Sequence, residues 1–335
     1  MIAADRAAIS PTAIPGDELR ARMDPETRGG LAGTLAENLP DGPIDVALIR
    51  ALDDRLRVDV EPSDPPRVES VVRPDGSTLT LRVHEPANPG ARGVAGPAVL
   101  WIHGGGMFLG SAATEDVFCA GLASRLGATV PGATVVAVDY RLAPEHPHPA
   151  ALEDCLAALA WTAARHPRVV VAGASAGGGL AAGLCLAARD AGGPAIAAAH
   201  LLYPMLDDRH ETASARELAD TAVWNRRLAD LAWSAYLGGR DADAYAAPSR
   251  ADDLSGFPST YLEVGELDLF RDEDALFAGR LAAAGVPIEF ELVAKAVHAF
   301  ELIAPDAAIS RAAVERRDAA LARALAPSPS LAEGA

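Results

Sequence analysis

Ser175 has the sequence surroundings of a catalytic nucleophile. It is the central residue of Gly-Ala-Ser-Ala-Gly at 173–177, between a β-branched run at 168–172 and a helix-forming run at 178–189. Between a strand and a helix, G-x-S-x-G forms a sharp turn that exposes the serine hydroxyl above the sheet edge. The following helix also directs its N-terminal amides toward that point. Without these flanks, the motif would indicate an ordinary turn in a glycine-rich chain. With them, it indicates that Ser175 is a nucleophile.

A second glycine run could stabilise the charge that such a serine creates. When a serine attacks a carbonyl carbon, the oxygen becomes an oxyanion, and each donor placed to meet it is worth roughly 2–4 kcal/mol. His103 and three glycines follow an apolar run at 98–102, and glycine allows the backbone to approach closely. We therefore predict Gly104, Gly105 and Ala176 as oxyanion-hole donors, with His103 organising the loop. A phosphate loop is disfavoured because no Gly-Lys-Ser/Thr follows.

A serine nucleophile also needs a base, and the base needs an acid to orient it. His298 comes shortly after an apolar strand-like run at 288–293, and Asp268 comes shortly after another at 259–264. Both positions are at the carboxyl ends of expected strands, where Ser175 also lies. The order Ser, Asp, His is the order of an α/β hydrolase. Competing acids are near, namely Glu266, Asp272, Glu273 and Asp274, but acids in a first helical turn commonly serve the helix dipole.

Composition excludes several partner classes. The chain has 335 residues, half of them hydrophobic, a net charge of −17 and a pI of about 4.8. That charge speaks against nucleic acid and against anionic membrane surfaces. Cys119, Cys155 and Cys185 have no metal-binding or redox spacing, and an odd, sparse set fits a reducing compartment. No signal-like or membrane-spanning apolar run is present, so we expect a cytoplasmic protein, and a homo-oligomer stays open.

We expect neither a metal nor a cofactor. The pair His146 and His148 is separated by one residue and has no matching third ligand, which makes it a weak metal signal. Acyl transfer to water from a serine requires no cofactor, and the expected partner is a small-molecule ester substrate.

From residue 97 onward, strand-like and helix-like segments alternate. We expect strands at 98–102, 134–138, 168–172, 197–203, 259–264 and 288–293, and helices at 115–127, 149–165, 178–189, 272–284 and 306–325. A hairpin at 67–73 and 78–83 precedes them. This alternation predicts an α/β fold with a mostly parallel central sheet and helices on both faces.

One long segment interrupts this alternation. Residues 207–247 are helical, charged and aromatic, and crossovers of that length usually carry a function. We interpret them, with residues 1–57, as a helical cap over a single domain that comprises 1–335; a decorated crossover without a binding role is the alternative. Four aromatic residues of this region and its flank either line a pocket or pack in the core. They are Tyr203, Trp224, Trp233 and Tyr236.

Several long motifs in one order resemble the hormone-sensitive-lipase-like family of α/β-hydrolase carboxylesterases. They are the His-Gly-Gly-Gly run at 103–106, Val-Asp-Tyr-Arg-Leu-Ala-Pro-Glu-His-Pro at 138–147, Gly-Ala-Ser-Ala-Gly-Gly at 173–178, Gly-Glu-Leu-Asp-Leu-Phe-Arg-Asp-Glu at 265–273, and His-Ala-Phe at 298–300. The resemblance covers about 97 to 300. It implies ester hydrolysis through an acyl-enzyme, with Ser175, Asp268 and His298 as triad and Gly104, Gly105 and Ala176 as donors. It also implies that 140–147 is structural.

The chain departs from the family pattern at three places near the site. The family usually has Asp, less often Thr, where Ala174 stands, proline where Leu269 stands, and glycine where Ala299 stands. These departures affect loop geometry and substrate preference and leave the triad complete.

The residues that follow the glycine run complete the expected site. Met107, Phe108 and Leu109 either form apolar walls beside the substrate or pack in the core. We expect small to medium esters with short acyl chains as substrates. An amidase or deacetylase acting on a specialised metabolite, and a non-catalytic small-molecule receptor on the same fold, are the alternatives.

Overall fold

The computed structural model describes residues 13–58, 60, 62–86 and 96–327, and an eight-stranded sheet forms its centre. The strands follow the order β1-β2-β4-β3-β5-β6-β7-β8. Their bounds are β1 Arg67–Val72, β2 Thr78–His84, β3 Ala98–Ile102, β4 Thr134–Asp139, β5 Val169–Ala174, β6 Ala198–Leu202, β7 Thr260–Gly265 and β8 Ile288–Val293. The first two pairings are antiparallel and the others parallel, so the predicted mostly parallel sheet is confirmed.

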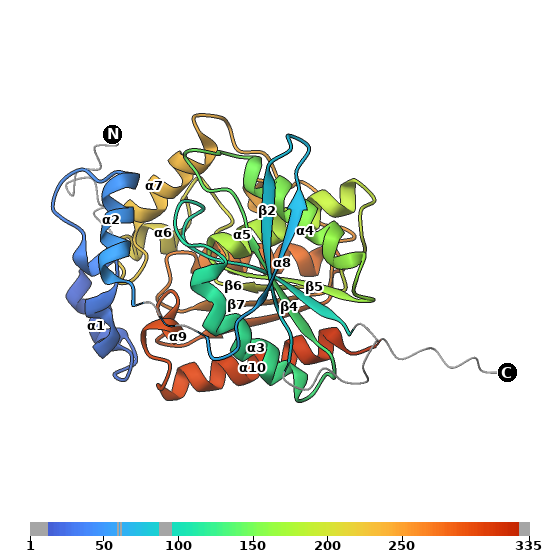
Figure 1. Ribbon diagram of the computed structural model, residues 1–335. Coiled ribbons are helices and arrows are strands. Elements are labelled where there is room, and N and C mark those ends of the chain that lie inside the picture. Colours follow the sequence, from blue (N-terminus) through green and yellow to red (C-terminus); the bar gives the residue numbers. More distant parts are fainter. Residues whose placement is uncertain (1–12, 59, 61, 87–95, 328–335) are drawn as a thin grey trace.

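Helices cover both faces of this sheet (Figure 1). The principal ones are α1 Gly16–Arg22, α2 Val46–Leu56, α3 Asp116–Gly127, α4 Ala150–Ala163, α5 Ala176–Asp190, α6 Ala213–Glu217, α7 Arg226–Leu237, α8 Arg271–Ala283, α9 Phe300–Ile303 and α10 Ala308–Leu325. One large core cluster lies between the sheet and α4, α5 and α8, and a second lies between the sheet and α3 and α10. The sheet is therefore the middle layer of three.

The central strands form because their residues are apolar on both faces. Every residue of β3 is buried, as is every residue of β7, and β-branched side chains dominate β4 and β5. Such continuous apolar runs are typical of parallel strands covered by helices on both sides. The exposed hairpin β1–β2 alternates instead, and its turn carries Gly76 at a φ of 83°.

The carboxyl ends of the parallel strands face one edge of the sheet, where α/β proteins place their ligands. Gly104 follows β3 by one residue, and Ser175 follows β5 directly. Asp268 lies in the loop after β7, and His298 lies in the loop after β8. The topology thus brings together four segments that are far apart in the sequence.

The predicted cap segments lie side by side at one end of the molecule, where α1, α2, α6 and α7 gather (Figure 1). The Ile14 amide donates to the Glu217 carbonyl at 2.8 Å, and Arg227 donates to the Pro40 carbonyl at 3.2 Å. Of the segment 1–57, residues 1–12 lie outside the described residues. The two segments thus contact each other, and their role as a cap stays a prediction.

Two local features differ from the sequence expectations. Helix α5 begins at Ala176 rather than at 178, because Ser175 itself occupies the N-cap position. The segment 207–247 contains one short and one longer helix, α6 and α7, joined by turns; Asn225 caps α7 by accepting a hydrogen bond from the Leu228 amide.

The three cysteines are buried free thiols. No helix among the described residues combines the length and the apolar character needed to cross a bilayer.

Candidate active site

The structure brings Ser175, His298 and Asp268 into one hydrogen-bonded row. His298 Nε2 lies 2.9 Å from Ser175 Oγ, and His298 Nδ1 lies 2.8 Å from Asp268 Oδ2. All three side chains are buried, and Ser175 retains 7% exposure. A hydroxyl, an imidazole and a carboxylate in this order can pass the serine proton to the ring and stabilise the ring once it is charged.

The backbone at Ser175 has the strained geometry of a nucleophile elbow. Its φ is 56° and its ψ is −120°, a conformation that non-glycine residues rarely adopt. The flanking glycines permit the turn, since a Cβ on Gly177 would lie 2.0 Å from the Ile102 carbonyl oxygen and one on Gly173 would lie 2.3 Å from the Gly177 oxygen. Each motif glycine is thus required by a close backbone approach.

The predicted oxyanion donors lie beside the serine. A Cβ on Gly104 would lie 3.5 Å from the Ser175 Cβ, so this loop touches the elbow. Gly105 has a φ of 103° and lies so close to Leu109 that a Cβ would come within 2.4 Å of its carbonyl oxygen. Ala176 is the first residue of α5, and its amide therefore has no acceptor in the preceding turn. Gly104 and Ala176 thus lie next to Ser175 and Gly105 lies in the same loop as Gly104, and the role of the three amides as oxyanion donors stays a prediction.

His103 organises this loop and is not placed as a base. Its Nδ1 lies 2.8 Å from the Gly104 oxygen, and its ring stacks on Tyr140 with centroids 4.1 Å apart. The Tyr140 hydroxyl donates to the His103 carbonyl at 3.0 Å. Burial lowers the pKa of His103 to about 4, so the ring is neutral at ordinary pH.

Three of the four acids that compete with Asp268 in the sequence have other partners, and Asp274 is buried with no hydrogen-bond partner among the described residues. Glu266 accepts the Lys295 amide at 2.8 Å, and Asp272 accepts the Ser214 amide at 2.7 Å. Glu273 accepts the amides of residues 206 and 207, which follow β6. Asp268 accepts the Phe270 amide at 3.0 Å as well as the histidine, which fixes the carboxylate plane. Asp272 and Glu273, in the first turn of α8, therefore bind amides of neighbouring segments, a role beyond the expected interaction with the helix dipole.

The residues that depart from the family pattern lie at this loop edge. Ala299 adopts a left-handed backbone with a φ of 50°, where a glycine would be unstrained. Leu269 is fully buried in the larger core cluster. Ala174 lines the cavity with a methyl group where a carboxylate is usual in the family.

A cavity of about 570 Å³ opens over Ser175 and His298. Of the three predicted wall residues, Leu109 lines it; Met107 and Phe108 do not, because their side chains point into the core beneath the loop. Of the four aromatic residues considered from the sequence, Tyr203 and Trp224 line the cavity, whereas Trp233 and Tyr236 are core residues. This cavity is within the size range of small-molecule sites.

Sequence reasoning missed several cavity-lining residues. They come from segments without a recognised motif, namely Asp53, Arg57, Trp101, Glu115, Phe118 and Glu301. Glu301 could have been suggested as a lining residue from the sequence, because it lies three residues after His298. Glu115 could not, because nothing in the local sequence shows which way the residues before α3 point.

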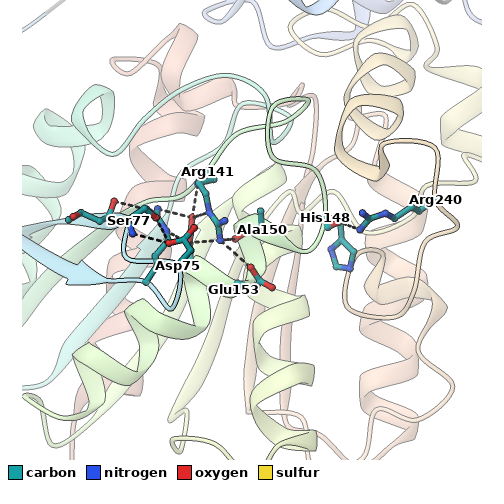
Figure 2. A network of polar contacts seen from close by, with 10 residues as sticks. Asp75, Ser77, Arg141, His148, Ala150, Glu153 and Arg240 are labelled. Atoms are coloured by element: carbon teal, nitrogen blue, oxygen red, sulfur yellow. Dashed lines mark hydrogen bonds and ion pairs between the residues drawn. The ribbon is translucent and has the colours of Figure 1, made fainter.

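The segment 140–147, which the family resemblance marks as structural, and the two residues after it are held from several sides (Figure 2). Arg141 donates to the Ala150 carbonyl and to Glu153, both at 3.1 Å, and Arg240 donates to the His148 carbonyl at 2.8 Å. Arg50 of α2 donates to the Phe108 carbonyl at 3.0 Å and joins this segment to the glycine loop. The His148 ring contacts a tyrosine hydroxyl and a carboxylate rather than a second histidine.

Comparisons with known proteins agree with this geometry. A family model described as alpha/beta hydrolase fold matches residues 99–302. Esterase LipI of Mycobacterium tuberculosis is 37% identical over 273 residues, which are 75% of this chain and 81% of that protein. Carboxylesterase NlhH of the same organism is 39% identical over 247 residues, 68% of this chain and 74% of that protein.

A solved structure titled bacterial heroin esterase is similar with a TM-score of 0.81 and 38% identity, covering 92% of this chain and 99% of that one. The named relatives are esterases, so neither the amidase nor the receptor alternative is favoured. The fold, the motifs and these relatives agree: the chain belongs to the hormone-sensitive-lipase-like family of α/β-hydrolase carboxylesterases and hydrolyses carboxylic esters.

Proposed function

We propose that Ser175, His298 and Asp268 carry out this hydrolysis through an acyl-enzyme. The observation that supports it is the pair of contacts at His298, 2.9 Å to the Ser175 oxygen and 2.8 Å to the Asp268 carboxylate. His298 takes the hydroxyl proton as Ser175 attacks the ester carbonyl, then gives the proton to the departing alcohol. It next takes a proton from water as the water attacks the acyl-enzyme, and gives that proton to Ser175 Oγ as the acyl–oxygen bond breaks and the acid leaves.

The amides of Gly104, Gly105 and Ala176 stabilise the oxyanion in both steps. Because these donors are backbone groups, two in a loop that packs on the elbow and one at the start of α5, they are in place before the charge develops. Such preorganised donors commonly supply the largest electrostatic contribution to acyl transfer. Asp268 holds the imidazole in the tautomer that accepts the serine proton.

The substrates are small to medium esters with short acyl chains. The cavity of about 570 Å³ must hold both the acyl and the alcohol portion beside Ser175. The wall is mainly apolar near the nucleophile, with Leu109, Leu202 and Val223 among the lining residues. A panel of p-nitrophenyl esters of increasing acyl length tests this size limit: kcat/KM should fall for long chains, and an increase through the long-chain range would contradict it.

Replacement of the nucleophile tests the mechanism. Ser175→Ala should abolish nearly all turnover, by roughly 10⁶-fold in kcat, because the acyl-enzyme can no longer form. The wild-type protein should be labelled at Ser175 by a fluorophosphonate probe, and the variant should stay unlabelled. Unchanged turnover in a folded Ser175→Ala protein would end the proposal.

We also propose that the protein acts in the cytoplasm. The three cysteines are free and buried, which is usual in a reducing compartment. Fractionation of the native cells with detection by antibody tests this location, and recovery outside the cytoplasm would contradict it.

A further inference from the structure

Two carboxyl side chains, those of Glu115 and Glu301, line the ester-binding cavity, and no cationic side chain of the described lining is paired with either. The described lining residues include four charged side chains, Asp53, Arg57, Glu115 and Glu301. Asp53 and Arg57 form an ion pair at 3.3 Å. Glu115 and Glu301 have no cationic side chain beside them in the lining. We call Glu115 and Glu301 the acidic wall.

Glu301 is 8% exposed, and only one of its oxygens is satisfied. Its Oε1 accepts hydrogen bonds from the Tyr203 hydroxyl and from Arg317 Nη1, the latter at 2.9 Å. Its Oε2 is buried and has no hydrogen-bond partner among the described residues. A buried carboxylate oxygen without a donor is costly for the protein, and a cation bound beside Glu301 would lower that cost.

The two carboxyls of the acidic wall differ in their ionic partners. Glu301 shares one buried guanidinium, that of Arg317, with Glu263, which Arg317 binds at 2.6 Å. Arg316, which is partly exposed, reaches Glu263 at 3.7 Å. Among the described residues, Glu115 accepts a hydrogen bond only from the neutral indole N–H of Trp101, at 3.2 Å, and takes part in no ion pair. A cation bound in the cavity would therefore meet a carboxyl that has no cationic partner of its own.

Aromatic faces accompany these carboxylates. Trp101, Phe118, Tyr203 and Trp224 line the same cavity, and the rings of Trp101 and Phe118 lie 4.6 Å apart. Aromatic faces attract ammonium groups, more strongly where water is excluded, and the pairing of aromatic rings with carboxylates is the chemistry that binds alkylammonium ions.

The acidic wall lies within reach of the reacting ester. The ring of Tyr203 is 4.7 Å from that of His298, and its hydroxyl binds Glu301. One tyrosine side chain therefore separates the base from the carboxylate. An ester held at Ser175 can place a substituent a few bonds away against this wall.

We propose that the acidic wall and its aromatic neighbours form a subsite for an ammonium group, so that the enzyme prefers esters that carry a cationic amine in the acyl or alcohol portion. This substrate class rests on the ester hydrolysis proposed above. The carboxylates of Glu115 and Glu301 neutralise the ammonium charge, and the rings of Trp101 and Tyr203 contact its alkyl groups.

The test compares esters that have the same shape and differ only in charge. For the alcohol portion the pair is choline acetate and 3,3-dimethylbutyl acetate. For the acyl portion the pair is the p-nitrophenyl esters of 4-(trimethylammonio)butanoate and 5,5-dimethylhexanoate. In at least one pair, kcat/KM of the cationic ester should exceed that of the neutral one by about tenfold, the value expected of one desolvated ammonium contact.

Glu115→Gln and Glu301→Gln should each lower this cationic-to-neutral ratio several-fold. Glutamine keeps a hydrogen-bond acceptor and removes the charge. Because Glu115→Gln keeps an acceptor for the Trp101 indole, it still tests the subsite if the Glu301→Gln protein fails to fold. Glu18→Gln, on the exposed surface of α1, is the matched control: it removes the same charge from a chain of net charge −17 and should leave the ratio unchanged.

The outcomes separate the two proposals. A ratio near one in both pairs, or a ratio that both glutamine variants preserve, would overturn the ammonium subsite while hydrolysis of the neutral esters upheld the ester mechanism. An equal loss of ratio in the Glu18→Gln control would also overturn it, because the preference would then come from the overall charge. Failure of the wild-type protein on all four esters would overturn the ester mechanism and the subsite with it.

Discussion

The two sides of the cavity are built in opposite ways. On the catalytic side, Ser175, His298 and Asp268 satisfy one another, and Asp268 also accepts a backbone amide. On the acidic wall, Glu301 leaves an oxygen without a partner and Glu115 has one weak neutral donor. A complete hydrogen-bond network holds reacting groups in fixed positions, whereas an incomplete one retains interaction energy for a ligand. This difference agrees with the two proposals, in which one side carries out the hydrolysis and the other selects cationic esters.

The largest expected effect breaks the catalytic side. Asp268→Asn keeps the size of the side chain but favours the wrong tautomer of His298, so kcat should fall by roughly 10⁴-fold. Steady-state kinetics on a neutral short-chain ester measures it. Glu266→Gln, two residues away, is the control and should keep most activity, because Glu266 binds the Lys295 amide and partly exposed Arg22 rather than His298. Equal losses in the two variants would show that the loop, rather than the triad acid, matters.

A smaller loss should follow from moving the oxyanion loop. Gly105→Ala places a methyl group where the Leu109 carbonyl lies 2.4 Å away, at a φ that side chains avoid. Displacement of one donor should lower kcat by about 10²-fold, with less change in KM. Gly279→Ala, in α8 with nothing within 4 Å of the added methyl, is the matched control. Normal kcat in a folded Gly105→Ala enzyme would remove Gly105 from the oxyanion hole.

The pH dependence of selectivity sharpens the comparison between the two sides. Burial raises the pKa of Glu115 to about 7, so this carboxyl is mainly neutral at pH 6 and mainly ionised at pH 8. The ratio of kcat/KM for choline acetate to that for 3,3-dimethylbutyl acetate should therefore rise about two- to threefold across this interval, because a charged Glu115 attracts the ammonium. Any effect of pH on the catalytic step is common to both esters and cancels in the ratio. A flat ratio would contradict a role for Glu115.

The groups that face Glu115 support this assignment of the pH effect. Burial raises the pKa of the Cys119 thiol and of the Tyr140 and Tyr203 hydroxyls, which stay neutral across the interval. Burial opposes ionisation of Glu301, but the neighbouring Arg317 outweighs it and lowers the Glu301 pKa. Asp116 is ion-paired with Arg82. Glu115→Gln should abolish the pH dependence of the ratio.

The smallest expected effect lies at Ala299, which joins the two sides between His298 and Glu301. Its left-handed backbone costs roughly 1–2 kcal/mol for a residue with a Cβ, and glycine removes that cost but adds about 0.5–1 kcal/mol of unfolded-state entropy. Ala299→Gly should therefore raise the free energy of unfolding by about 0.5 kcal/mol, measured by urea denaturation. A clear loss of stability would show that the methyl group contributes packing that outweighs the backbone strain.

The sequence predicted the catalytic side almost completely, because its signals are local. A β-branched strand, two glycines around Ser175 and a helix immediately afterwards dictate an elbow, whatever lies elsewhere in the chain. The strand ends before Asp268 and His298 could be located in the same way, and parallel strands bring their carboxyl ends to one edge. The alternation of strands and helices determined the layered fold for the same reason.

Only the tertiary structure decided which other side chains face the substrate. Leu109 reaches the cavity while Met107 and Phe108 turn into the core, although the three are consecutive and equally apolar. Glu115 and Glu301 lie far apart in the sequence and meet because α3 and α9 border the same opening. The direction in which a side chain points is set by how distant elements pack together. The sequence pattern shows the backbone period of each element, but it does not show which neighbour that element contacts.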